Sequence, residues 1–396
     1  MRRTQTFVVV VLAALAGCGD EEAAGESEVS RSEGPAEAPA EPAGEPAEPA
    51  GEPAQEPAAA RPFGPEYPTE GEIASRLAGL PPVAINPTSR TIGALQLSAQ
   101  HCVYDGPAFV AIDMSSLYSI GDLAWSTDGS LYVIDNEHRL RRYLVEGGDD
   151  RCELHLDREF GENGFFSTGT TMGVRLDSIS ADEQGHVYVS AGSSGVRRIT
   201  GRNIDYHCAE VRGGVEVNAA GTEGIAWYAS SGQRVHFTDS GCTVEPWTPR
   251  AGNLSPPDRD PSEASHVFLA GDRVFVAAVS PTLIRELDLD GAPVGPAFGA
   301  TDNDGRFCSV SDVAACGSNL CVADGNCKDL YVIDANRSSL GHVDLAALFG
   351  LGSGAAPRVT RVRSGVAYYA IRPDLSRGEG SRQVSEGFIF RVRGLQ

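Results

Sequence analysis

Short apolar runs with alternating polar positions recur along the chain from residue 118 onward. Each run is followed by a small polar turn and a second apolar run, which is the pattern of two antiparallel strands joined by a hairpin. Six segments share this pattern: DLAWSTDGSLYVID from Asp122, DSISADEQGHVYVSA from Asp177, EGIAWYASSGQRVHFTD from Glu223, SHVFLAGDRVFVAA from Ser265, DVAACGSNLCVAD from Asp312 and TRVRSGVAYYAI from Thr360. The chain is therefore predicted to repeat a strand–turn–strand unit.

Glycine occupies the predicted turn of every unit. The six turn glycines are Gly129, Gly185, Gly232, Gly271, Gly317 and Gly365. Tight hairpins need residues with positive φ, which glycine adopts without a steric penalty. The strands that begin after these glycines recur about every 47 residues, and further apolar runs follow most units, which is typical of four-stranded propeller blades. We therefore expect an all-β fold, a six-bladed β-propeller formed by residues 118–396.

Ring closure is expected to involve the segment that precedes the repeats. The last unit ends in GFIFRVRGLQ and lacks a fourth strand. The sequence HCVYDG around Cys102 can supply that strand from the other end of the chain, which would lock the ring. Residues 63–117 are therefore interpreted as a lead-in segment that includes the closing strand.

The N-terminus has the layout of an export signal. Arg2 and Arg3 precede an apolar stretch, Phe7–Ala16, which is too short to span a bilayer. The end of residues 1–17 and the following cysteine read Leu-Ala-Gly-Cys, which resembles the lipobox of bacterial lipoproteins. This resemblance implies that Cys18 is acylated and becomes the first mature residue. An ordinary secretory signal with an incidental cysteine is the alternative.

The resemblance also implies a location. A lipoprotein is held in the bacterial cell envelope by its acyl chains, since each buried CH₂ contributes roughly 0.8 kcal/mol and two or more chains anchor a protein stably. Gly19 stands where an aspartate would favour retention at the inner membrane. We therefore expect a membrane-anchored protein of the outer membrane.

Residues 18–62 are predicted to form the lipidated N-terminus and a disordered acidic linker. Between residues 35 and 60 the chain contains only Pro, Ala, Glu, Gly and Gln, which cannot bury enough apolar surface to order a chain. Residues 20–60 hold twelve acidic residues and one basic residue, half of the net charge of −22. Nowhere do Lys and Arg cluster as a nucleic-acid surface requires, so nucleic acid is excluded as a partner.

The other eight cysteines predict disulfides, because their number is even and the chain is expected outside the cytoplasm. Cys316 and Cys321 flank a short turn and can bridge a hairpin, with Cys308 and Cys327 closing outside them. A zinc site built from these four is the alternative, but their spacing matches no common zinc pattern. Three pairings stay open for the remaining cysteines, Cys102, Cys152, Cys208 and Cys242.

The hairpins with the pattern DG.LYV.D resemble those of NHL-type six-bladed propellers and, more distantly, those of the gluconolactonase group. The resemblance covers about 280 residues and implies the fold; these families include both binding proteins and enzymes. Glu223-Gly224 resembles the Glu-Gly opening of the gluconolactonase group, whose glutamate binds a metal together with asparagine and aspartate ligands of other blades. The other ligands have no convincing match here, and TDNDGRF (301–307) is interpreted as a turn.

Acidic residues begin four of the six aligned units, and first strands of propeller blades border the central channel. These residues are Asp122, Asp177, Glu223 and Asp312. Carboxylates that converge there can coordinate Ca²⁺ or another divalent cation. Solvated acids without a metal are the alternative that we favour, so no cofactor is required.

The sequence therefore favours a binding or interaction module over an enzyme. We expect a monomeric propeller domain, tethered to a membrane by its lipid anchor, that binds a protein, small-molecule or glycan ligand. A metal-dependent hydrolase of the lactonase type is the alternative, and it would need a metal and a base converging in the channel. Trp125, Trp227 and Trp247 offer aromatic surface for a sugar, but two of them lie in aligned strands and are interpreted as blade core.

Overall fold

The computed structural model describes residue 75 and residues 85–106, 108–112, 120–135, 139–148, 150–161, 164–166, 176, 178–228, 231–249, 264–279, 282–299, 307–325, 327–351, 358–359, 362, 364–371 and 384–396. The described strands belong to one compact unit, Ala59–Gln396. The predicted signal, Cys18 and the acidic linker lie outside the described residues. In the described part of the chain, no helix combines the length and the apolar character needed to cross a membrane.

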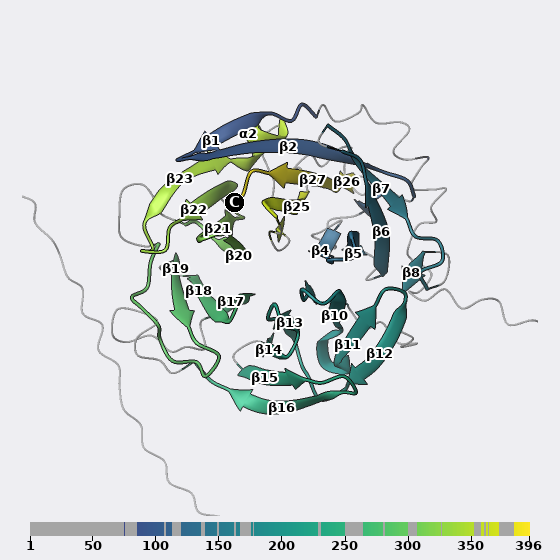
Figure 1. The fold of residues 1–396 in the computed structure, drawn as a ribbon, viewed down its shortest axis with the longest axis vertical. Coiled ribbons are helices and arrows are strands. Elements are labelled where there is room, and N and C mark those ends of the chain that lie inside the picture. Colours follow the sequence, from purple (N-terminus) through teal and green to yellow (C-terminus); the bar gives the residue numbers. More distant parts are fainter. Residues whose placement is uncertain are drawn as a thin grey trace, which may run out of the picture. The chain divides into compact units, whose positions relative to one another are not determined.

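Four antiparallel sheets follow one another along the chain (Figure 1). The first contains β9 (Ser178–Ala181), β10 (His186–Ser190), β11 (Val196–Thr200) and β12 (Asn203–Cys208). The second contains β13 (Gly214–Val217), β14 (Glu223–Tyr228), β15 (Ser231–Phe237) and β16 (Cys242–Trp247). The third contains β17 (Ala264–Ala270), β18 (Arg273–Val279) and β19 (Thr282–Leu287), and the fourth contains β20 (Val310–Cys316), β21 (Asn319–Asp324), β22 (Asp329–Ile333) and β23 (Ser339–Asp344).

A ten-stranded sheet joins the first and last parts of the ring. One group in it is β4 (Ile120–Trp125), β5 (Ser130–Asp135), β6 (Leu140–Glu146), β7 (Cys152–Leu156) and β8 (Phe165–Phe166). The other group is β24 (Arg358–Val359), β25 (Val366–Ile371) and β27 (Phe388–Arg393), with β1 (Ser89–Ile92) and β2 (Leu95–Tyr104) beside it. A separate pair is formed by β3 (Val110–Ile112) and β26 (Val384–Glu386), and the helical segments are η1 (Gly192–Ser194) and α2 (Leu345–Phe349).

Strand β2 connects the two groups because its two halves pair with different strands. Residues Ser98–His101 pair antiparallel with β27 near the C-terminus. Residues Cys102–Tyr104 pair in parallel with β7. The HCVYDG segment thus lies at the junction, where one continuous strand hydrogen-bonds to the last strand of the chain and to an early one.

The inner strands form a ring of contacts around the centre. Going round the ring, β4 contacts β9, then come β13, β17, β20 and β24, and β24 contacts β4 again. An all-β, propeller-like fold with very little helix is therefore confirmed.

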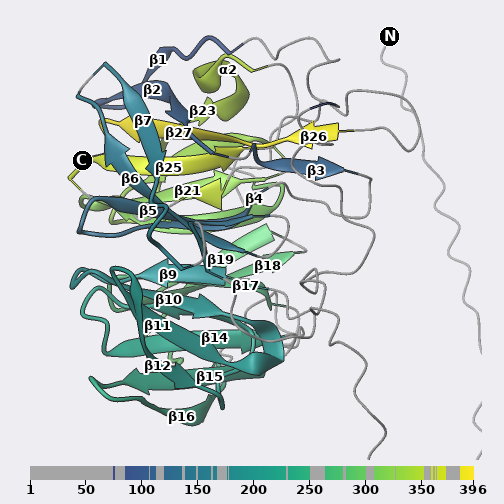
Figure 2. The same cartoon turned by 90° about the vertical axis from the view of Figure 1, so that its right-hand side faces the viewer.

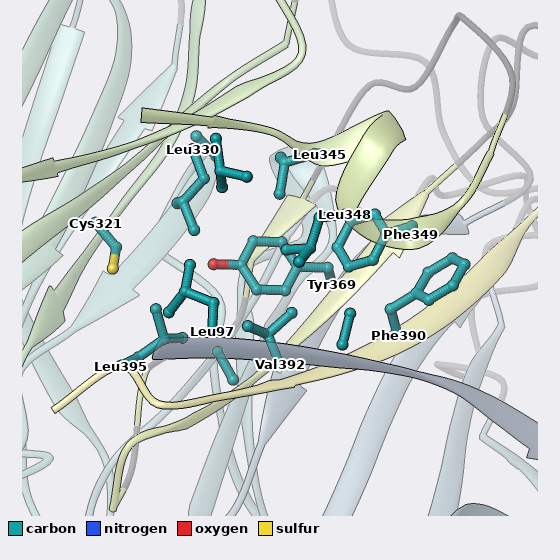
Figure 3. Close-up of a cluster of buried hydrophobic side chains, with 14 of the residues drawn as sticks. Leu97, Cys321, Leu330, Leu345, Leu348, Phe349, Tyr369, Phe390, Val392 and Leu395 are labelled. Carbon is teal, nitrogen blue, oxygen red and sulfur yellow. The ribbon is translucent and has the colours of Figure 1, made fainter. Parts of the chain in front are cut away.

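Apolar residues from neighbouring sheets fill the spaces between them. Strand β5, SLYVID, is buried at all six positions because sheets cover both of its faces. The largest cluster lies between the fourth sheet, β2 and the group β25–β27 (Figure 3). Here Phe349 of α2 stacks on Phe390 of β27, with ring centroids 4.3 Å apart. The short helix thus packs against the strands that join the two ends of the chain.

The two ends of the ring differ. At one end, which we call the turn face, tight turns link the two innermost strands of most sheets, and the C-terminus lies there (Figure 2). Five of the six predicted turn glycines have positive φ, as expected: Gly129, Gly185, Gly271, Gly317 and Gly365. The opposite end, from which β3 and β26 extend, is called the loop face (Figure 2).

The sixth glycine, Gly232, is not in a turn, and that prediction was wrong. It lies inside β15, directly opposite Trp247 in β16. A Cβ at this position would come 2.6 Å from an atom of the Trp247 ring and 3.0 Å from one of the Trp227 ring. Glycine is therefore needed here because two indoles pack onto the strand, and not because the backbone turns.

Candidate functional site

The centre of the ring holds a small cavity between the inner strands. It measures about 40 Å³ and is lined by β4, β9, β13 and β20. Three carboxylates contribute to its wall, namely those of Asp122, Glu216 and Asp312. Two of the four acids that the sequence singled out, Asp122 and Asp312, thus meet at one cavity, whereas Asp177 lies outside the described residues.

Glu223 does not line this cavity. Its sheet has an additional strand, β13, which lies inside β14, so the Glu223 segment forms the second and third strands and not the first and second. The Glu223 carboxylate instead contacts Arg234 Nε at 3.0 Å and His236 Nδ1 at 2.7 Å. Glu216 of β13 takes the inner position; the run GVEV that forms this strand alternates as a strand does, but with four residues it gives only a weak signal.

The carboxylate of Asp122 connects neighbouring inner strands. One Asp122 oxygen accepts a hydrogen bond from the amide of Leu123 at 2.9 Å, and the other accepts one from the amide of Ile179 in β9 at 3.0 Å. Asp312 similarly accepts from the amide of Val313 at 2.8 Å. Hydrogen bonds to an ionised carboxylate are stronger than those between neutral groups, so both acids stabilise the inner strands.

Serine hydroxyls extend these links to the next sheet. The Ser178 hydroxyl accepts from the Val215 amide at 2.8 Å, and the Ser180 hydroxyl accepts from the Val217 amide at 3.1 Å. The same Ser180 hydroxyl lies 3.4 Å from a Glu216 carboxylate oxygen. The polar wall of the cavity therefore serves as a set of connections between inner strands.

Within the described ranges, only one group brings three potential metal ligands within 4.8 Å of one another: Cys308, Asp324 and Cys327. Cys308 and Cys327 form a disulfide, and cysteine binds a metal through a free thiolate, which a disulfide does not offer. Asp324 is fully buried and accepts hydrogen bonds from the amides of Ser309 at 3.1 Å and Cys327 at 2.9 Å. This group is therefore a disulfide-closed loop whose backbone amides are hydrogen-bonded to Asp324, and it does not offer the thiolates of a zinc site.

All eight of the remaining cysteines are in disulfides, and the expectation of disulfide bonds is confirmed. Cys316 is bonded to Cys321 and Cys308 to Cys327, the two pairs that the spacing suggested. The pairing that the sequence left open is Cys102 with Cys152 and Cys208 with Cys242. The first of these joins β2 to β7, and the second joins β12 to β16 of the next sheet.

Each tryptophan packs against another aromatic ring; Trp247 is buried, and Trp125 and Trp227 are half-buried. Trp125 meets Tyr368 edge-to-face at 5.0 Å between ring centroids, and Trp227 meets Trp247 in the same way at 5.9 Å. The Trp247 indole also donates a hydrogen bond to the carbonyl of Leu289 at 3.0 Å. These indoles do not form an open aromatic platform.

A larger cavity of about 840 Å³ lies between the β9–β12 sheet and the β13–β16 sheet. We call it the inter-sheet groove, and its lining residues are Ser193, Ala209, Glu210, Arg212, Tyr228, Ser231, Gly232, Gln233, Val244, Glu245 and Pro246. Ser193 lies between β10 and β11, and Glu210 and Arg212 lie between β12 and β13. These connections are at the end opposite to the β9–β10 turn, so the groove opens on the loop face.

Comparison with known proteins gives weak similarities only. No protein-family model matches the chain, and no curated protein matches it either. A virginiamycin B lyase from Staphylococcus aureus aligns at 10% identity over 75% of this chain and 99% of that chain, with a TM-score of 0.43. A structural-genomics protein from Bacteroides thetaiotaomicron aligns at 12% over 75% and 76%, with a TM-score of 0.46.

A third solved structure, the PQQ-bound aldose sugar dehydrogenase from Streptomyces coelicolor, aligns at 14% identity over 78% of this chain and 100% of that chain, with a TM-score of 0.38. Identities and TM-scores this low say nothing about the activity of this chain.

Proposed function

We propose that this chain is a membrane-tethered lipoprotein whose propeller acts as a binding module. In this proposal the ring has six blades, with the ten-stranded sheet counting as two, and the ring of inner-strand contacts through β4, β9, β13, β17, β20 and β24 supports that count. The resemblance of residues 15–18 to a lipobox supports the tether. The module would present its loop face to a ligand.

One observation carries the proposal: the two cavities differ in what their polar groups do. At the small central cavity both carboxylate oxygens of Asp122 accept hydrogen bonds from backbone amides. This side chain therefore stabilises the contact between β4 and β9. The inter-sheet groove is about twenty times larger in volume, from about 840 Å³ against about 40 Å³, and falls in the range of roughly 300–1,000 Å³ typical of ligand pockets. A large open groove, together with a small central cavity whose Asp122 carboxylate is hydrogen-bonded to backbone amides, favours binding over catalysis.

A metal-dependent hydrolase remains the second candidate, because Asp122, Glu216 and Asp312 line one cavity. A cation bound there would stabilise the fold by RT ln(1 + [L]/Kd), about 2.7 kcal/mol at a hundredfold excess over Kd. Its removal would leave like charges facing one another. Chelation therefore separates the two candidates.

The test uses the full chain purified in detergent. We expect elemental analysis to find no stoichiometric metal, and EDTA to leave the melting temperature unchanged in the wild type, in Asp122→Asn and in Glu223→Gln. Glu223→Gln is the matched control, since it makes the same carboxylate-to-amide change away from the cavity. One bound cation per chain, with an EDTA-dependent fall in melting temperature that Glu223→Gln retains and Asp122→Asn loses, would favour the hydrolase.

A further inference from the structure

The inter-sheet groove contains an unusual side chain. Tyr228, the last residue of β14, is 59% exposed and is the one aromatic residue among the exposed large hydrophobic residues of the described ranges. Tyrosine buries a large apolar ring and offers a polar hydroxyl, so proteins usually cover it or use it for contact with a partner. An exposed tyrosine in the wall of a large groove points to a ligand.

The wall beside Tyr228 is held in place by one side chain. The Gln233 carbonyl oxygen accepts a hydrogen bond from the Arg212 amide at 2.7 Å, and its NH₂ group donates to the Glu210 carbonyl at 3.2 Å. Gln233 belongs to β15, so a strand of one sheet fixes the loop that leaves the other. The backbone of Glu210 and Arg212 is thus ordered before any ligand arrives.

Covalent and steric constraints fix the same loop. The disulfide between Cys208 and Cys242 ties the end of β12 to β16 of the neighbouring sheet. Gly213 has φ of +86°, and a Cβ there would lie 2.1 Å from the carbonyl oxygen of Trp227. The two walls are therefore pre-organised, which reduces the entropy lost when a ligand binds.

The charged side chains along the groove are of both signs. Glu210 and Arg212 are both exposed, lie on the same loop and carry opposite charges. The Glu245 carboxylate is directed to other partners, with His236 Nε2 at 3.3 Å and Arg234 at 3.8 Å. A strongly anionic ligand would meet the Glu210 carboxylate, and a strongly cationic one would meet the Arg212 guanidinium, so the groove favours a neutral polar ligand.

We propose that the inter-sheet groove binds a neutral oligosaccharide, with one sugar ring packed on Tyr228. A sugar presents an apolar C–H face, which suits an exposed tyrosine ring, and a rim of hydroxyl groups that both donate and accept hydrogen bonds. Neighbouring hydroxyls can donate to the Glu210 carboxylate and accept from the Arg212 guanidinium. This inference rests on the proposed function as a binding module and names its site and ligand class.

The experiment is isothermal titration calorimetry on the full chain in a polyoxyethylene detergent, which carries no sugar. The probes are maltotriose, cellotriose, mannotriose and chitotriose, with the acidic trisaccharide trigalacturonate as the charged comparison. We expect at least one neutral probe to bind, and to bind more tightly than trigalacturonate. Tyr228→Ala should lower the affinity at least about tenfold, equivalent to about 1.4 kcal/mol.

Leu340→Ala is the matched control, because Leu340 is also exposed, at 43%, and lies on β23 away from the groove. Leu340→Ala should leave the affinity unchanged, and both variants should have the melting temperature of the wild type. Absence of binding by all four neutral probes, or tighter binding of trigalacturonate, would overturn the inference. Neutral binding that survives Tyr228→Ala would also overturn it, while leaving the binding-module proposal standing with its site elsewhere.

Discussion

At the scale of single residues, a buried ion pair anchors the strands β5 and β6. Asp135 and Arg141 are each only 1% exposed, and the Arg141 guanidinium lies 2.8 Å from the Asp135 carboxylate. Arg139 reaches the same carboxylate at 3.0 Å, and the Phe109 ring lies 4.7 Å below the Arg141 guanidinium. Burial alone would raise the pKa of Asp135, but the attraction of Arg141 and Arg139 outweighs it and holds the pKa below its ordinary value.

Replacing Asp135 by Asn should be strongly destabilising, because it removes the negative charge that lies 2.8 Å from the buried Arg141 guanidinium. We expect the free energy of unfolding to fall by about 3–5 kcal/mol at pH 7. Since the folded-state pKa is lowered, the carboxylate stabilises the fold above its ordinary pKa near 4, and this contribution is lost as the pH falls through the lower folded value. Urea unfolding of the wild type and of Asp135→Asn between pH 7 and pH 2 measures this. The difference between their free energies of unfolding should become smaller below about pH 4.

The control for this change is Asp128→Asn. Asp128 contacts Arg142 at 2.9 Å, but its side chain is 34% exposed, and partly exposed ion pairs contribute roughly 0–1 kcal/mol. A difference between the wild type and Asp135→Asn that stays constant down to pH 2 would contradict the electrostatic explanation.

At the scale of strands, the sequence predicted hairpins well and their position in a sheet less well. Alternating residues and turn glycines mark two adjacent strands whichever sheet position they occupy. The segment from Glu223 looks like the others, yet β13 lies inside it, and a four-residue run such as GVEV is too short to stand out by its pattern. The shift of one strand explains why Glu223 does not line the central cavity.

The inter-sheet groove could not be read from the sequence for a related reason. Its lining comes from separate stretches around Ser193, Glu210, Tyr228 and Glu245, which only sheet packing brings together. Asp122 and Asp312 were found because equivalent positions of repeated strands meet at the centre of any ring of this kind. The sequence repeat thus predicts which residues lie at the centre of the ring. The contacts between two particular sheets follow only from the three-dimensional structure.

Disulfides should stabilise the protein according to the length of chain that they enclose. Cys102 and Cys152 are separated by 50 residues, and Cys316 and Cys321 by 5. Loop-closure entropy assigns about 4 kcal/mol to the first and about 2 kcal/mol to the second. We expect the Cys102→Ser/Cys152→Ser variant to melt at a clearly lower temperature than Cys316→Ser/Cys321→Ser in calorimetry; the reverse order would show that local packing decides.

At the scale of the whole molecule, the predicted tether depends on one residue. If Cys18 carries the lipid, Cys18→Ser should appear in the soluble fraction after cell lysis, because acyl chains supply the membrane affinity. Membrane fractions washed with high salt and probed by immunoblotting measure this. Arg212→Gln, a change on the loop face, should stay with the membrane, and a washed Cys18→Ser variant that remains there would contradict the lipid anchor.

The double pairing of β2 also determines how the molecule would carry a mechanical load. A pull from the N-terminal side first reaches the hydrogen bond between the Thr88 amide and the Leu348 carbonyl. It then reaches β1, which pairs with β2, and after that the antiparallel contact between β2 and β27. Peeling would stop at Cys102, where the chain is covalently joined to Cys152. The disulfide between β2 and β7 would therefore act as a mechanical stop. Tension on a tether would separate the outer strands first, while the groove on the loop face keeps its shape.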